Sequence, residues 1–520
     1  MSSPIRMSGM ISGLDTESIV TALTSDYQTK VDKYKKSQTK LSWKQDAWKE
    51  VNTEVNDFYN SLDKYRYSSA WNLQKATVSD ATKATVSANG KAFNGTQTLK
   101  INQLATSASL TSGQLAAYTD SDNKSQTVTT STKLSKISTK AAGNLTIKVG
   151  KESTTFTVDS STTVSDFVNA LKSAGLNASF DETQQRFYIS SKKSGDDQNF
   201  SITAATDSTS DIVSKLKLDK SSGAVVSNGQ DASIDLGGIN YTNSTNNFSI
   251  NGLNIQALAK TDSEITINTQ TDTQGIYDKV KEFISSYNDL INDLTDRYNA
   301  ASSGSYEPLT DDEKSQMSDT EVEKWEKKIK TGLLRRDDTL DSIMNTLTNG
   351  MMASYYDDSV ATMDINGKQT LNAGVTSAKK YSLATFGIMT KGILQSATNR
   401  QYEYHIDGDE DDDSVSSNTD KLMTAITEDP DKVIDLVKNV ANNLSRNLKK
   451  QMTATSLRSV FTVYNDKEMA SEYSSYTELI NTWTTRLNDM QDSYYKKFSK
   501  MESTLSKLQQ STSSISGLTS

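Results

Sequence analysis

Apolar residues recur every seven positions at both ends of this 520-residue chain. Such a heptad pattern is typical of a helix that packs along a partner helix, and we refer to the apolar stripe as the seam. The N-terminal seam consists of Val20, Tyr27, Tyr34, Leu41, Trp48, Val55 and Leu62. The C-terminal seam consists of Tyr473, Ile480, Leu487, Tyr494, Met501 and Leu508, with Trp483 and Met490 at the companion position three residues on.

The simplest partner for one end of the chain is the other end. An apolar stripe is stable in water only when it is covered, so the pattern predicts a coiled-coil leg built from both termini. The companion positions in the first part of the N-terminal seam hold polar residues, namely Lys30, Ser37 and Lys44. This predicts loose helix packing in that part of the seam and a break in the helix near Trp43. Tryptophan side chains could also stack on a sugar or a base, but Trp43, Trp48 and Trp483 fit the heptad spacing, which favours the seam.

Between the two ends the period of the pattern changes twice. From Thr77 to about Thr271 polar and apolar residues alternate, which predicts short antiparallel strands at 84–88, 98–102, 145–149, 154–158, 186–190 and 264–268. One helix is expected among them at 165–173, and the Ser/Thr-rich stretch 121–139 is expected to be an exposed loop or mobile edge. From Gly275 the helical period returns, with further helices predicted at 321–331, 338–354 and 431–452.

These patterns predict an α+β chain of several domains. We expect helical legs from both termini (1–42 plus 466–520) and a mixed helical and β middle domain (43–72 plus 273–465). Two nested antiparallel β-rich modules follow in the centre, an inner one at 73–108 plus 230–272 and an outer one at 109–229. A low mean hydropathy of −0.61 favours thin, elongated pieces over one large globule.

Composition excludes several kinds of chemistry. The chain has no cysteine and a single histidine, so a disulfide, a thiolate nucleophile and a multi-histidine metal site are impossible within one chain. His405 is expected to be an ordinary solvated residue. The net charge is −9 without a basic stripe, which argues against a nucleic-acid partner, and we expect neither membrane insertion nor a cleavable signal peptide.

The acidic run at 407–413 is the one dense cluster of potential metal ligands in the sequence. Six carboxylates in seven residues could bind calcium, yet the spacing lacks the pattern of an EF-hand loop. The alternative interpretation is a solvated loop between strands. We therefore predict no catalytic, cofactor-binding or metal-binding residues, and no enzyme.

Several segments, in order along the chain, resemble one family. They include MSGMISGLDTESIV at 7–20, LSWKQDAWKEVN at 41–52, GTQTLKINQLA at 95–105, NGLNIQAL at 251–258, GLLRRDDTL at 332–340 and YYKKFSKMESTLSKLQQ at 494–510. This set is similar to the bacterial flagellar filament-capping proteins, also called hook-associated protein 2. The acidic loop at 405–418 departs from the family pattern.

The resemblance implies a secreted protein at the distal tip of the bacterial flagellum. Such caps are homo-oligomeric rings, usually pentamers, whose legs insert among filament subunits while the β-rich modules form a plate. The implied partners are a second copy of the chain, flagellin, the hook-filament junction protein and a dedicated chaperone before type III export. The implied function is to retain exported flagellin and to promote its folding and insertion during filament elongation.

Two other functions stay open from the sequence. A hook-filament junction protein or filament subunit would also pair its termini, although the motifs around Trp43 and Trp48 look like those of the cap. A surface adhesin would use the outer β module for cell adhesion, and the Ser/Thr-rich stretch there gives no basis for excluding it.

Overall fold

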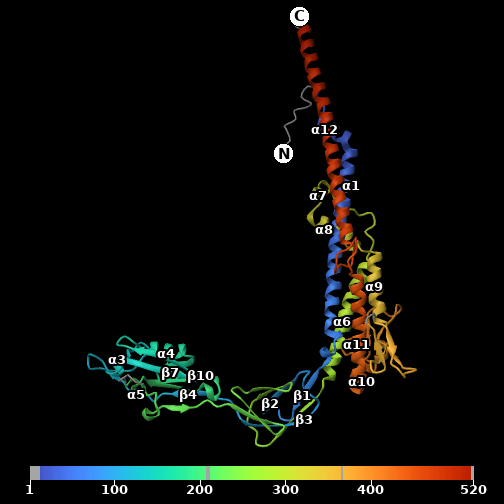
Figure 1. Ribbon diagram of the computed structural model, residues 1–520. Helices are drawn as coiled ribbons and strands as arrows, with labels where there is room; N and C mark the ends of the chain where they lie inside the picture. Colours follow the sequence, from blue (N-terminus) through green and yellow to red (C-terminus); the bar gives the residue numbers. More distant parts are fainter. Residues whose placement is uncertain (1–11, 206–210, 365–366, 517–520) are drawn as a thin grey trace. The chain divides into compact units, whose positions relative to one another are not determined.

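The computed structural model describes residues 12–205, 211–364 and 367–516. The chain forms two compact units, one of residues 1–71 plus 273–520 and the other of residues 72–272. The first unit is mainly helical and the second is mainly antiparallel sheet (Figure 1). This confirms the predicted α+β class with long helices from both termini.

The helical unit is built on two long terminal helices and a helical body. Its helices are α1 (Thr16–Ser61), α2 (Asp63–Arg66), α6 (Thr273–Tyr298), α7 (Asp311–Ser315), α8 (Asp319–Thr331), α9 (Asp338–Met351), α10 (Lys421–Glu428), α11 (Pro430–Gln451) and α12 (Asp466–Ser516). Three small two-stranded sheets accompany them: β18 (Tyr355–Tyr356) with β21 (Lys380–Tyr381), β19 (Ala361–Met363) with β20 (Gln369–Leu371), and β22 (Ile388–Thr390) with β23 (Tyr404–Ile406).

Local signals in the sequence start several of these helices. The Asp15 side chain accepts a hydrogen bond from the Ser18 backbone at 3.1 Å and caps α1, and Pro430 occupies the first turn of α11. The neighbouring acids Asp311 and Asp337 belong to helix starts as well, because Thr310 caps α7 and Asp337 caps α9.

The predicted break near Trp43 is wrong, since α1 is one helix from Thr16 to Ser61. The polar side chains at the companion positions make contacts of another kind than apolar packing. The Lys30 ammonium lies over the Trp483 ring, and Lys44 forms an ion pair of 2.9 Å with Asp337. The helix therefore continues without an apolar companion position, because neighbouring segments contact these side chains.

The β unit contains two separate apolar cores. One lies between a five-stranded sheet ordered β1-β17-β3-β13-β14 and a three-stranded sheet ordered β15-β16-β2. These strands are β1 (Gln74–Val78), β2 (Ala84–Ala88), β3 (Gly95–Gln103), β13 (Ala232–Leu236), β14 (Ile239–Asn243), β15 (Asn247–Ile250), β16 (Leu253–Ala257) and β17 (Ile265–Thr271). Every second residue of β13 and β16 is buried, which is the period-two pattern expected from the sequence.

The other core lies among residues 110–224. A four-stranded sheet ordered β12-β4-β10-β9, a three-stranded sheet ordered β11-β7-β8 and helix α4 (Val164–Ser173) surround it. The strands are β4 (Ser107–Thr111), β7 (Gly143–Val149), β8 (Glu152–Val158), β9 (Leu176–Asp181), β10 (Arg186–Ser194), β11 (Phe200–Ala204) and β12 (Val225–Ser227), with a small pair of β5 (Tyr118–Thr119) and β6 (Ser125–Gln126) and short helices α3 (Leu134–Ile137) and α5 (Ile212–Lys215). The exact boundaries of the nested modules stay a prediction.

The stretch 121–139 is not merely an exposed loop, so that prediction is wrong in part. Val128 and Leu134 are fully buried in the second core. The Gln185 side chain holds Val128 on both sides, because its amide oxygen accepts the Val128 N–H at 3.0 Å and its amide nitrogen donates to the Val128 carbonyl at 2.8 Å. Composition alone does not reveal single buried apolar residues of this kind among serines and threonines.

Candidate functional site

The two terminal helices lie side by side in opposite directions (Figure 1). Tyr27 packs against Trp483 with ring centroids 6.2 Å apart, and one heptad on, Tyr34 packs against Tyr476 at 6.5 Å. Residue numbers therefore rise along α1 as they fall along α12. The Gln38 side chain continues this antiparallel register by donating to the Thr477 hydroxyl at 2.7 Å.

The two halves of the seam differ in how well they are covered. The N-terminal seam is nearly closed, with Val20, Leu41, Trp48, Val55 and Leu62 buried and Tyr27 and Tyr34 half-buried. The C-terminal seam is more open, with Leu487 buried, Ile480, Trp483, Met490, Tyr494 and Met501 half-buried, and Tyr473 and Leu508 exposed. Apolar surface thus remains along α12, although a role of the seam in oligomerisation stays a prediction.

The C-terminal half of α1 packs against the helical body. Trp48 stacks on Tyr464 with centroids 5.5 Å apart and planes 10° apart, and the Asn52 side chain accepts the Val463 N–H at 2.9 Å. No sequence pattern pointed to Tyr464, because it lies in the non-periodic segment before α12. Leu23, three residues after the seam residue Val20, is 47% exposed and contributes little to the pairing.

A groove of about 650 Å³ opens where the two helices pair. Tyr27, Trp483 and Met490 supply its apolar surface. The Lys30 ammonium lies 4.1 Å and the Arg486 guanidinium 4.7 Å from the centre of the Trp483 ring, within range for cation–π attraction. Asp26 and Asp489 also line the groove. An elongated, mixed-charge groove of this kind suits a packed helix better than a reacting small molecule.

A cluster of four charged side chains joins α1 to α6. Arg297 forms ion pairs with Glu54 at 2.9 Å, Glu50 at 3.1 Å and Asp293 at 2.5 Å. Burial, together with the nearby carboxylates of Asp293 and Glu50, raises the pKa of Glu54 to about 7 against the opposing effect of Arg297. Sequence reasoning missed this cluster, although the spacing of Asp293 and Arg297 is a helical i, i+4 pair.

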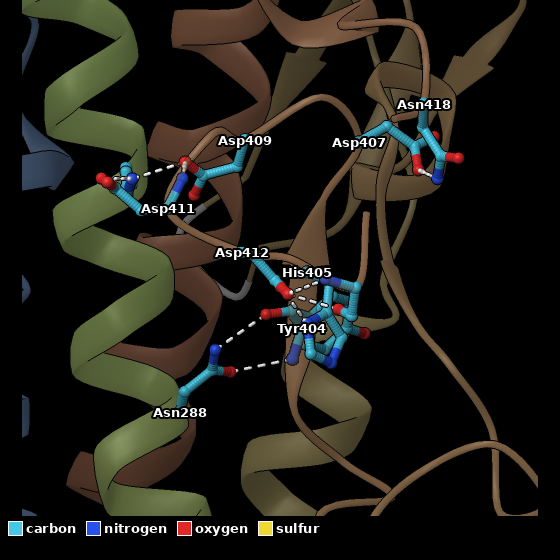
Figure 2. Close-up of polar contacts among 10 residues, drawn as sticks. Asn288, Tyr404, His405, Asp407, Asp409, Asp411, Asp412 and Asn418 are labelled. Atoms are coloured by element: carbon cyan, nitrogen blue, oxygen red, sulfur yellow. Dashed lines mark hydrogen bonds and ion pairs between the residues drawn. The ribbon is translucent and has the colours of Figure 1, made fainter. Parts of the chain in front are cut away.

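The acidic run contacts the helical body, and part of it stays exposed. It follows β23 and precedes α10, so it does not lie between strands. The Lys281 ammonium of α6 lies 2.6 Å from both Asp409 and Asp411, and Asp407 accepts a hydrogen bond from Asn418 at 2.8 Å (Figure 2). The predicted position between strands is therefore wrong, and the prediction of a solvated loop is wrong in part, because Asp407 and Asp409 are buried whereas Glu410, Asp411 and Asp413 are exposed.

His405 is not an ordinary solvated residue, which corrects a second prediction. Its side chain is only 13% exposed, and its Nδ1 is hydrogen-bonded to the Asp412 carboxylate (Figure 2). Burial opposes ionisation of Asp412, but hydrogen bonds from Ser414 and His405 outweigh it and lower the pKa of Asp412 to about 2. The backbone of the preceding residue, Tyr404, exchanges two hydrogen bonds of 2.8 Å with the Asn288 side chain of α6.

These contacts give the acidic run a structural role. The carboxylates of Asp407, Asp409, Asp411 and Asp412 contact lysine, histidine or asparagine side chains or backbone groups. Across the described residues no set of three or more His, Asp or Glu side chains is arranged to hold a metal ion. Over the same residues, no helix combines the length and the apolar character needed to cross a membrane.

Comparisons with known proteins agree across both units. A family model described as the flagellar hook-associated protein 2 C-terminus matches residues 229–510, and one described as the N-terminus matches residues 12–108. Flagellar hook-associated protein 2 of Halalkalibacterium halodurans is 26% identical over 469 residues, covering 84% of this chain and 80% of the relative. The protein of that name from Thermotoga maritima is 24% identical, covering 69% of this chain and 52% of the relative.

A solved structure also resembles the chain. The crystal structure of the D1-D2-D3 domains of the flagellar cap protein FliD from Escherichia coli covers 83% of this chain and 99% of its own, at 17% identity and a TM-score of 0.49.

Proposed function

The chain belongs to the flagellar hook-associated protein 2 family, and we propose that it caps the flagellar filament as a homo-oligomeric scaffold. In this role it would retain exported flagellin at the distal tip and promote its folding and insertion during elongation. The antiparallel pairing of α1 with α12 carries the proposal, because it joins both termini in one helical leg while apolar surface on α12 stays partly uncovered.

The proposed work is mechanical and does not require covalent chemistry. A helical leg with an incompletely covered stripe suits reversible packing against other helices, since each further contact removes apolar surface from water. We propose a second copy of the chain and flagellin as partners of this surface. The hook-filament junction protein is a further proposed partner. An export chaperone, which would act before secretion, is another.

Electron microscopy of the purified full-length protein tests the scaffold directly. We expect closed rings, five-fold in symmetry, and restored filament growth when the chain is supplied to cells that lack their own cap. A filament subunit or junction protein would instead give open filaments or single-layer additions to the hook. Helical polymers of the pure protein would contradict the cap.

The adhesin alternative concerns residues 109–229, which hold their own apolar core. A glycan array probed with the full chain and with a chain lacking these residues would separate adhesion from scaffold work. Glycan binding that disappears with the deletion, in cells whose filaments still grow, would favour an adhesin function for this part of the chain.

A further inference from the structure

A tight turn in the helical body presents two aliphatic side chains to water. Ile393 is 82% exposed and Leu394 is 99% exposed. The turn closes on the Gly392 carbonyl, which accepts the Ser396 N–H at 3.1 Å and the Ser396 hydroxyl at 2.8 Å. We call residues 391–396 the apolar turn. Single exposed aliphatic residues are common on protein surfaces, but two adjacent ones on a closed turn form a compact contact point.

The base of this turn is fixed to helix α6. The Arg400 guanidinium donates to Asp296 at 3.0 and 3.1 Å, and the Asn399 side chain donates to the same carboxylate at 2.9 Å. Asn299 donates to the Asn399 side-chain oxygen at 3.0 Å. The two aliphatic side chains are therefore held outward by an anchored loop, which lowers the entropy lost when they bind a partner.

A groove of about 460 Å³ between α1 and α6 has the complementary character. Phe58 and Leu290, each 5% exposed, are its apolar lining residues, and Ser61 and Ser286 lie beside them. Four carboxylates also line it: Glu54 and Asp293 already pair with Arg297, whereas Asp57 and Asp289 are exposed. The groove therefore suits an aliphatic segment that carries a positive charge, and the apolar turn begins with Lys391.

The base of the apolar turn lies farther along α6 than the groove. Asp296, which holds the base, follows the groove residues Asp289 and Asp293 by seven and three positions, so these side chains share one side of a helix with 3.6 residues per turn. The turn and the groove are nevertheless two different patches of one chain. A chain can therefore offer its turn to one neighbour and its groove to another.

We propose that Ile393 and Leu394 of one copy dock into the α1–α6 groove of a second copy, with Lys391 facing the carboxylates. This inference deepens the self-association in the proposed function and rests on it. Because two different patches of the chain meet, the contact is heterologous. Repeated copies close into a ring when a whole number of equal rotations from copy to copy completes a full turn.

Chemical cross-linking tests this contact in the full chain, which has no native cysteine. Copies with Gln395→Cys are mixed with size-tagged copies with Ser286→Cys and treated with a short bis-maleimide. We expect cross-linked dimers of one tagged and one untagged copy, and a ladder when one chain carries both cysteines. Neither single variant alone should cross-link. A matched control replaces Ser286→Cys by Thr320→Cys, an exposed position on α8 away from the groove.

Charge exchange provides a second measurement. Lys391→Glu alone and Asp289→Lys alone should each lower the cross-linking yield at least fivefold, and the two together should restore most of it. Ile393→Ser with Leu394→Ser should abolish the mixed dimers without loss of fold, because both side chains are exposed.

The outcomes separate this contact from the proposed function. Rings that form normally without mixed cross-links, or cross-links that tolerate the double serine variant, would overturn the contact and leave the ring scaffold standing. Efficient cross-linking by Gln395→Cys alone would also overturn it, since turns would then meet turns. A chain that stays monomeric at every concentration would overturn the contact and the scaffold together.

Discussion

Tyr27 and Trp483 lie near opposite ends of the chain, yet their rings pack 6.2 Å apart. Lys30 on α1 and Arg486 on α12 both place a positive charge over the same tryptophan, at 4.1 and 4.7 Å from its ring centre. The two ends are thus joined by an aromatic and cationic contact as well as by the heptad seam. This contact fixes the register in which the termini pair, and the seam beside it can be tested by substitution.

Leu487 and Met490 provide that test. Leu487 is buried and Met490 lines the groove between the helices, so replacing both by aspartate places two unpaired charges in the seam. We expect the pairing to weaken by about 2 kcal/mol or more, while the rest of the chain folds. Cells with this variant should export the protein, build hooks and release unpolymerised flagellin into the medium.

The matched control places two aspartates on the exposed side of α12, as Thr485→Asp with Asn488→Asp. These changes add the same number of charges without entering the seam, so filament length should stay near normal. Full-length filaments and no flagellin in the medium for the Leu487/Met490 variant would rule out a role of the seam in capping.

Regular elements of this fold were predictable because their period is local. The strand predicted at 84–88 matches β2, the helix predicted at 165–173 matches α4 to within one residue, and the helix predicted at 431–452 matches α11 to within one residue at each end. In each case alternate or helical spacing of apolar residues reports directly which face is buried. Pairing of the termini followed from the same signal, because each seam required a cover, whereas its antiparallel direction is seen only in the structure.

Features that depend on distant side chains were not predictable from period or composition. The acidic run looked solvated because nothing in the sequence indicates that Lys281 reaches Asp409 and Asp411. The stretch 121–139 looked exposed because its two buried anchors, Val128 and Leu134, are isolated among polar residues. The apolar turn at 391–396 shows no helical or strand periodicity. It is recognised only because its two aliphatic side chains are exposed in the fold.

Removing residues 109–229 should leave self-association intact. Thr106 and Gln230 exchange backbone hydrogen bonds of 2.9 and 3.1 Å, so the chain on either side of the deletion is already close, and a short glycine linker can join it. The second apolar core lies wholly within the removed residues. Light scattering should report the same number of copies per ring as in the full chain. Collapse to monomers would place essential ring contacts in the deleted part.

The charged cluster at Arg297 predicts a pH dependence of stability. The pKa of Glu54 is about 7 in the folded chain against 4.5 for an ordinary glutamate, so between these values the folded state holds a proton that the unfolded state releases. Its contribution to stability is therefore present below about pH 4.5 and is lost as the pH rises through 7. Glu54→Gln removes this titration, so its melting temperature should fall less than that of the unmodified chain between about pH 5.5 and pH 8.

Glu50→Gln is the matched control for this pH effect. Glu50 pairs with the same Arg297, but its side chain is 67% exposed, so the change should leave the slope of melting temperature against pH nearly as in the unmodified chain. Parallel pH profiles for Glu54→Gln and the unmodified chain would show that Glu54 does not titrate in this window.

The two acids that hold Lys281 allow a comparison at equal distance. Asp409 and Asp411 both lie 2.6 Å from the Lys281 ammonium, but the Asp409 side chain is 12% exposed and the Asp411 side chain is 85% exposed. Water screens the exposed pair, so Asp411→Asn should leave the free energy of unfolding nearly unchanged. Asp409→Asn should lower it by about 1–3 kcal/mol, because the half-buried lysine loses its shielded partner. Urea unfolding of both isosteric variants measures the difference, and equal losses would mean that burial does not set the strength of this contact.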